Sequence, residues 1–76
     1  MKKCLNNTFL EKVGLKIRLI RKKKGLSQEE LAEICESATA YIGTIERGIQ
    51  NPSLLLLKKI ADALDINICE IFDFTI

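Results

Sequence analysis

The stretch "SQEELAEICESATAYIGTIERG", residues 27–48, decides the fold. It holds two short helical patterns with only a few residues between them. The first opens on Ser27 and Glu30, a capping box in which each side chain bonds the other residue's backbone amide at a helix start. The second, over about 39–46, uses Thr, Gly and β-branched residues, which are poor helix formers. Such a helix must be held by packing rather than by its own propensity.

Further helical patterns flank this pair on both sides. Upstream, apolar residues recur at helical spacing, at Leu10, Val13, Ile17 and Ile20. That pattern ends in three lysines and Gly25, which suit the C-terminal end of a helix. Downstream, a core stripe is expected at Leu54, Leu57, Ile60 or Ala61, and Leu64.

The start and end of the downstream region are also marked. "NPS" at 51–53 opens its helix, with Asn51 as the candidate cap and Pro52 in the first turn. A last short helix is expected near 68–72. No alternating strand pattern of useful length occurs. The sequence therefore predicts an all-α domain of five short helices.

Composition fits one small folded domain over residues 1–76. The chain is 47% hydrophobic and 29% charged. Cys4, Cys35 and Cys69 form no CxxC motif and there is no His, so the usual zinc site of four Cys or His ligands cannot be built. We expect reduced thiols in a cytoplasmic protein. The longest apolar run, 54–57, is far short of the roughly 20 residues of a membrane helix.

Charge is distributed unevenly along the chain. Residues 1–24 carry nine Lys or Arg and one acidic residue, whereas residues 25–76 carry three basic and nine acidic ones. A basic N-terminal third suggests a polyanionic partner. A solvated helix face explains the same charges equally well.

Three segments together carry a family resemblance. "IRLIRKKKGLSQEEL", "LAEICESATAYIGTIERG" and "NPSLLLLKKIADALDI" resemble the lambda-repressor/Cro-like (XRE-type) helix-turn-helix family of bacterial and phage regulators. The resemblance covers roughly residues 13–72. It leaves an N-terminal extension, 1–8, and an apolar tail, 73–76, outside the matched part.

The resemblance implies that the second helix lies across the DNA backbone and the third enters the major groove. The residues implied to face base edges are Thr39, Ala40 and Thr44. Those implied to hold phosphates are Gln28, Tyr41, Arg47, Asn51 and Ser53. Arg21 and Glu46 match the family's buried ion pair. Plainer roles stay open: Gln28 as a solvent-facing residue, Tyr41 as a cover for the turn, and the Lys22–Lys24 run as a favourable helix end.

Three features depart from the family pattern. Glu36 stands in the turn where the family commonly has Gly, at a cost on the order of 1 kcal/mol if that position needs positive φ. Ser37-Ala38 replaces the usual apolar-Ser pair, so either Ser37 caps the third helix one place early or that helix starts uncapped. Apolar residues also occupy normally polar surface positions, namely Leu15, Leu19, Leu55, Phe74 and Ile76. They mark an interface, or the tail folds back over Leu15 and Leu19.

These observations predict a sequence-specific DNA-binding transcriptional regulator, a repressor-type homodimer on a palindromic operator. The candidate dimer-interface residues are Ile68, Ile71, Phe74 and Ile76. The alternative is a protein-interaction module, such as an antitoxin or adaptor, whose apolar surface binds a protein. An enzyme is not expected, because there is no His, no nucleophile with a base and no phosphate loop. We expect double-stranded DNA as the partner and no membrane, cofactor, metal or small-molecule ligand.

Overall fold

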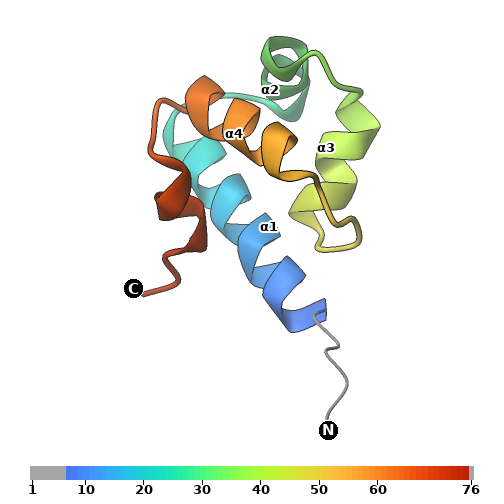
Figure 1. Ribbon diagram of the computed structural model, residues 1–76. Helices are drawn as coiled ribbons and strands as arrows, with labels where there is room; N and C mark the ends of the chain where they lie inside the picture. The colour runs from blue at the N-terminus through green and yellow to red at the C-terminus, as the bar shows by residue number, and fades with distance from the viewer. Residues whose placement is uncertain (1–6, 76) are drawn as a thin grey trace, which may run out of the picture.

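The computed structural model describes residues 7–75, and within them four α-helices are followed by one 3₁₀-helix (Figure 1). The elements are α1 (Asn7–Lys23), α2 (Gln28–Cys35), α3 (Thr39–Glu46), α4 (Leu54–Ala63) and the 3₁₀-helix η1 (Ile68–Phe72). No strand occurs in this part of the chain, and the all-α class is confirmed. The count of five short helices needs a small correction. The fifth is a 3₁₀-helix, and α1 has 17 residues.

The core lies between α1 and the other elements. α1 packs against α3 and against η1, while α2 contacts both α3 and α4 (Figure 1). All five elements contribute fully buried apolar side chains, namely Ile17, Leu31, Ile42, Ile45, Ile60, Leu64 and Ile71. Cys35 belongs to this core, and burial raises the pKa of its thiol. The short α3 is thus held by its two buried isoleucines, as its poor propensity requires.

Each α-helix is followed, within two residues of its end, by a residue with left-handed backbone conformation. These residues are Gly25 (φ 78°), Glu36 (φ 57°), Gly48 (φ 78°) and Asp65 (φ 59°). In each case the next residue's amide donates to a carbonyl five residues earlier, which satisfies one free carbonyl of the last turn. Glu36 therefore does occupy a position that favours glycine, and the suspected strain of about 1 kcal/mol applies there.

The start of α3 settles a sequence-based alternative, and the start of α4 corrects a sequence-based expectation. α3 begins at Thr39 after Ala38, and no side chain caps it, so the helix starts uncapped in the predicted register. The expected start of α4 was wrong. Ser53 is the cap, its Oγ accepting from the Leu56 amide at 3.0 Å, and Pro52 lies buried before the helix.

The C-terminal segment folds back along α1. Phe9 stacks on Phe72, with ring centroids 6.3 Å apart, and meets Phe74 edge-on at 5.9 Å. The Lys12 Nζ lies 5.8 Å from the centre of the Phe74 ring. These contacts anchor the segment at the N-terminal half of α1.

The tail residues that the structure describes, 73–75, leave the apolar positions further along α1 uncovered. Leu15 and Leu19 remain 52% and 55% exposed. With Phe74 and the neighbouring tail they line an open groove of about 420 Å³. Hydrogen bonds from Thr75 lower the pKa of the Asp73 carboxyl at the groove's edge. The suggested fold-back therefore occurs beside these leucines without burying them.

Candidate nucleic-acid interface

α2 and α3 are joined by a turn of three residues, 36–38. The capping box that starts α2 is present. Ser27 Oγ accepts from the Glu30 amide at 3.0 Å, and Glu30 Oε1 accepts from the Ser27 amide at 2.8 Å. Two short helices with such a turn, inside a small helical domain, form a helix-turn-helix. In DNA-binding proteins with this arrangement, the second helix of the pair lies in the major groove. The corresponding helix here is α3.

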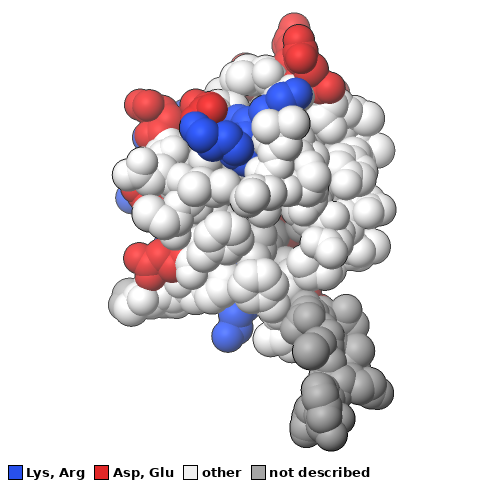
Figure 2. All heavy atoms as spheres, viewed as in Figure 1, with Lys and Arg blue, Asp and Glu red and all other residues white. Residues whose placement is uncertain are grey.

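The outer side of α3 carries short side chains. Thr39 and Ala40 are exposed and Thr44 is half-buried, while Ile42 and Ile45 on the opposite side are buried. The Thr44 hydroxyl donates to the Tyr41 carbonyl at 2.7 Å. The surface over α3 is almost free of charged side chains on the face seen in Figure 2. This side of α3 offers small groups that allow close approach of a partner.

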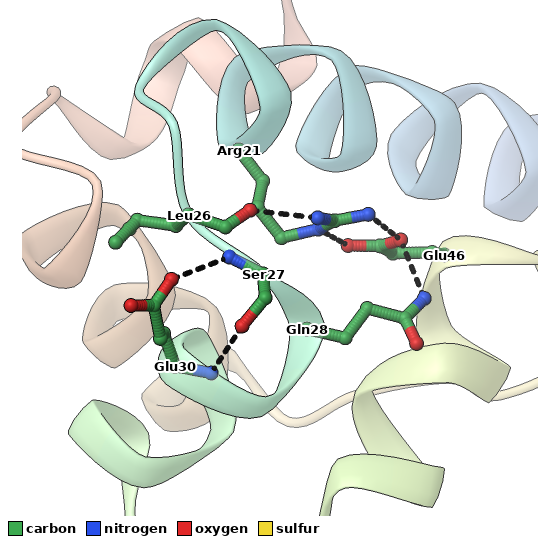
Figure 3. A network of polar contacts seen from close by, with 6 residues as sticks. All are labelled: Arg21, Leu26, Ser27, Gln28, Glu30 and Glu46. Carbon is green, nitrogen blue, oxygen red and sulfur yellow. Dashed lines mark hydrogen bonds and ion pairs between the residues drawn. The ribbon is translucent and has the colours of Figure 1, made fainter.

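Arg21 and Glu46 form a buried ion pair that ties α1 to the end of α3 (Figure 3). Arg21 Nε donates to Glu46 Oε2 at 2.6 Å, and a second guanidinium nitrogen donates to Oε1 at 3.1 Å. The remaining one donates to the Leu26 carbonyl at 2.8 Å. The bidentate geometry matches a guanidinium to a carboxylate and fixes both side chains.

Gln28 joins this pair, which the sequence did not reveal. Its Nε2 donates to Glu46 Oε1 at 2.9 Å (Figure 3). Gln28 and Glu46 lie 18 residues apart on different helices, so no local pattern connects them. Only the packing of α2 on α3 brings the two side chains together.

The other candidate phosphate-binding residues lie at the surface. Arg47 and Asn51 are exposed and Tyr41 is half-buried. The Ser53 hydroxyl oxygen already accepts a hydrogen bond as the cap of α4. Arg47 and Gln28 both approach Gly43, because a Cβ atom added there would lie 3.4 Å from Arg47 Nη1 and 3.6 Å from Gln28 Oε1.

The candidate residues of the dimer interface differ in their surroundings. Ile71 is fully buried in the chain's own core, and Ile68 packs against that core. Phe74 is half-buried on α1, and Ile76 lies outside the described residues.

None of the helices described between residues 7 and 75 combines the length and apolar character needed to cross a membrane.

The fold and the α2–α3 pair define a helix-turn-helix protein. A helix-turn-helix family profile matches residues 17–71, and the chain belongs to this family. It is similar to the control protein C.BamHI of Bacillus amyloliquefaciens, with 44% identity over 82% of this chain and 78% of that protein. It is also similar to the HTH-type transcriptional regulator SinR of Bacillus subtilis, with 40% identity over 80% of this chain and 56% of SinR.

Solved structures agree with this assignment. The restriction-modification controller protein C.AhdI from Aeromonas hydrophila superposes with a TM-score of 0.82 and 46% identity, over 83% of this chain and 96% of that one. SinR in complex with DNA superposes with a TM-score of 0.76 and 40% identity, over 80% and 98% of the two chains. The present chain spans about half the length of the Bacillus regulators SlrR and SinR.

Proposed function

We propose that this chain is a sequence-specific DNA-binding transcriptional regulator that reads the major groove with α3. The observation that carries the proposal is the helix-turn-helix itself, which leaves Thr39, Ala40 and Thr44 on the outer side of α3. SinR, 40% identical to this chain, has been crystallised with DNA, which supports the same role here. The short side chains favour methyl contacts to thymine, with DNA shape supplying much of the discrimination.

Phosphate contacts are assigned to residues around this helix. They are Gln28, Tyr41, Arg47, Asn51 and Ser53. Such contacts fix the position of a protein on DNA without reading sequence. They also release counterions, so the affinity should fall steeply with salt.

The test starts with a selection of bound duplexes from a random pool, followed by binding measurements at several salt concentrations. The matched pair of variants is Ala40→Glu, on the outer side of α3, and Cys69→Glu, exposed on η1. We expect the first to weaken binding on the order of a hundredfold, because like charges facing each other cost several kcal/mol. Cys69→Glu should bind almost as the parent does. No enrichment of any sequence, or equal effects of the two variants, would reject the proposal.

We further propose that the chain acts as a homodimer. One short helix reads only a few base pairs, whereas a twofold dimer reads two half-sites about 34–36 Å apart and favours a palindrome. The groove between α1 and the tail, with exposed Leu15 and Leu19 beside Phe74, is the surface that supports this. Because Ile71 is taken up by the core, Phe74 and Ile76 remain the better interface candidates.

Sedimentation of the full chain, of a truncation ending at Asp73, and of Leu19→Lys tests the dimer. We expect a dimer at tens of micromolar for the full chain and monomers for both changes. Since Phe74 also packs on Phe9, a thermal melt must show that the truncated chain is folded. Leu19 is half exposed, so Leu19→Lys should leave the fold intact. A monomeric full chain, or a dimer that survives Leu19→Lys and the truncation, contradicts this interface.

A further inference from the structure

The outer side of α1 carries a groove that none of the proposed DNA contacts uses. Four of its lining residues recur at spacings of three and four along the helix, namely Lys12, Leu15, Lys16 and Leu19. Residues so spaced share one side of a helix. Gly14 lies on the other side, because a Cβ atom added there would collide with main-chain atoms of α3. A helix turns about 100° per residue, so Lys12 and Leu19 point about 160° and 140° away from Gly14 and from α3.

This groove combines exposed apolar side chains with positive charge. Leu15 and Leu19 are more than half exposed beside Phe74. Lys12 and Lys16 line the same groove, and neither forms an ion pair within residues 7–75. Among the described residues that line it, only Asp73 is acidic, and its carboxylate already accepts a hydrogen bond from the Thr75 amide at 3.1 Å. The groove is therefore both apolar and cationic.

These two properties together select the chemistry of a partner. Duplex DNA supplies phosphates but, apart from thymine methyl groups, few apolar ones, so it would leave Leu15 and Leu19 in water. The chain's own segment 1–6 has two lysines and no acidic residue, so its charge does not complement the groove. A second copy can cover the leucines, but a twofold interface sets the same patch against itself. The lysines of the two copies then come close together, which weakens the contact.

The length of the groove suits a helix as the partner. Lys12 and Leu19 are about two helical turns apart along α1, roughly 10 Å. An amphipathic helix offers an apolar stripe with the same repeat, and such helices bind in apolar grooves through residues one turn apart. Acidic residues beside that stripe would meet the lysines.

We propose that the groove between α1 and the tail binds an acidic amphipathic helix of a partner protein. Its apolar side chains pack on Leu15, Leu19 and Phe74, and its carboxylates pair with Lys12 and Lys16. The regulatory consequence rests on the proposed homodimer, because the acidic helix and the second copy compete for one surface. The helix gains ion pairs where the second copy brings repulsion, so it displaces that copy. A displaced chain has one α3 only, and its affinity for a palindrome falls.

The first test is a selection of displayed peptides, each about four helical turns long, on the full chain. Peptides that also bind Leu19→Lys are discarded, and Leu15→Lys takes its place if that variant does not melt cooperatively. We expect the remaining peptides to carry apolar residues one turn apart with Asp or Glu beside them. No remaining peptide, or peptides without acidic residues, would overturn the proposal.

Charge reversal tests the ion pairs. Lys12→Glu with Lys16→Glu should weaken the binding of a selected peptide about a hundredfold, and exchanging the peptide's acidic residues for Lys should recover most of the loss. The matched control is Lys58→Glu with Lys59→Glu, which changes the net charge equally at exposed positions of α4 and should have little effect. Equal losses in the two double variants, or no recovery with the reversed peptide, contradict the ion pairs.

The same two double variants separate a protein partner from DNA. Their affinities for a duplex should fall by similar factors, because both change the net charge equally. A much larger loss for Lys12→Glu with Lys16→Glu would assign this side of α1 to DNA and overturn the proposal.

Sedimentation with a selected peptide tests the competition. We expect the peptide to convert the dimer of the full chain into a monomer with peptide bound. A dimer that stays intact with the peptide bound rejects the competition alone. A full chain that is monomeric without peptide rejects the proposed dimer, whereas the selection and the charge reversal still decide the docking site.

Discussion

Replacing Glu46 with alanine is expected to lower the free energy of unfolding by about 3–5 kcal/mol. Arg21 is only 7% exposed, and the change removes the acceptor of two of its hydrogen bonds at once. The guanidinium keeps only the Leu26 carbonyl, so a charge is left buried without a counter-charge. The free energy of unfolding of a small domain is only about 5–15 kcal/mol, so this loss is a large part of the total stability. Urea denaturation followed by circular dichroism measures it.

An exposed ion pair on α4 supplies the control. Lys58 Nζ lies 2.6 Å from Asp62 Oδ1, but both side chains are more than half exposed. Lys58→Ala should change stability by no more than about 0.5 kcal/mol, as is usual for exposed pairs one helical turn apart. If Glu46→Ala loses no more than Lys58→Ala does, the Arg21–Glu46 pair does not stabilise the fold.

Local signals in the sequence were sufficient to place most of the helices. The capping box at Ser27 marked the start of α2, and Gly48 marked the end of α3. The bounds of α3 were predicted correctly even though its residues are poor helix formers. Its two isoleucines have the spacing of a buried helix face, and burial outweighs propensity in a packed domain.

The start of α4 shows where local reasoning stops. Asn51 and Ser53 both carry a side-chain oxygen that can cap a helix, and Pro52 between them suits a first turn. The sequence favoured Asn51, whereas the structure uses Ser53. Pro52 is buried, so the packing of the loop fixed the choice, and this packing leaves no local sequence pattern.

The sequence suggests which residue types form the candidate site, but it says less about how they are arranged. The candidates on α3 follow from helical periodicity and the family resemblance. The Gln28–Glu46 hydrogen bond and the position of Gln28 over Gly43 depend on how two helices cross. Ile71 was ambiguous for a similar reason, because an apolar residue near the end of a chain can serve the core or an interface. Only its complete burial assigns it to the core.

The second large expected effect comes from a substitution at Gly14, where α1 packs against α3. A Cβ added to Gly14 would lie 2.3 Å from the Ile45 carbonyl oxygen and 2.6 Å from that of Glu46. These distances are far below contact, and the atoms belong to the main chain of α3. The backbones of α1 and α3 therefore touch directly at Gly14. This contact lies at Glu46, whose carboxylate accepts hydrogen bonds from Arg21 and Gln28.

Gly14→Ala is expected to lower the free energy of unfolding by about 3 kcal/mol, the upper end of the usual cost of overpacking, because main-chain atoms cannot rotate away as a side chain can. The direction of this change in the free energy of unfolding is informative, because replacing Gly with Ala inside a helix otherwise stabilises a protein by up to about 1 kcal/mol. Gly43→Ala in α3 is the matched control for stability, because its new methyl group would meet nothing closer than 3.4 Å. Thermal and urea denaturation should thus move the two variants in opposite directions. If Gly14→Ala proved as stable as Gly43→Ala, α1 and α3 would have to be further apart than the structure places them, and the Arg21–Glu46–Gln28 contacts that depend on their approach would be in question as well.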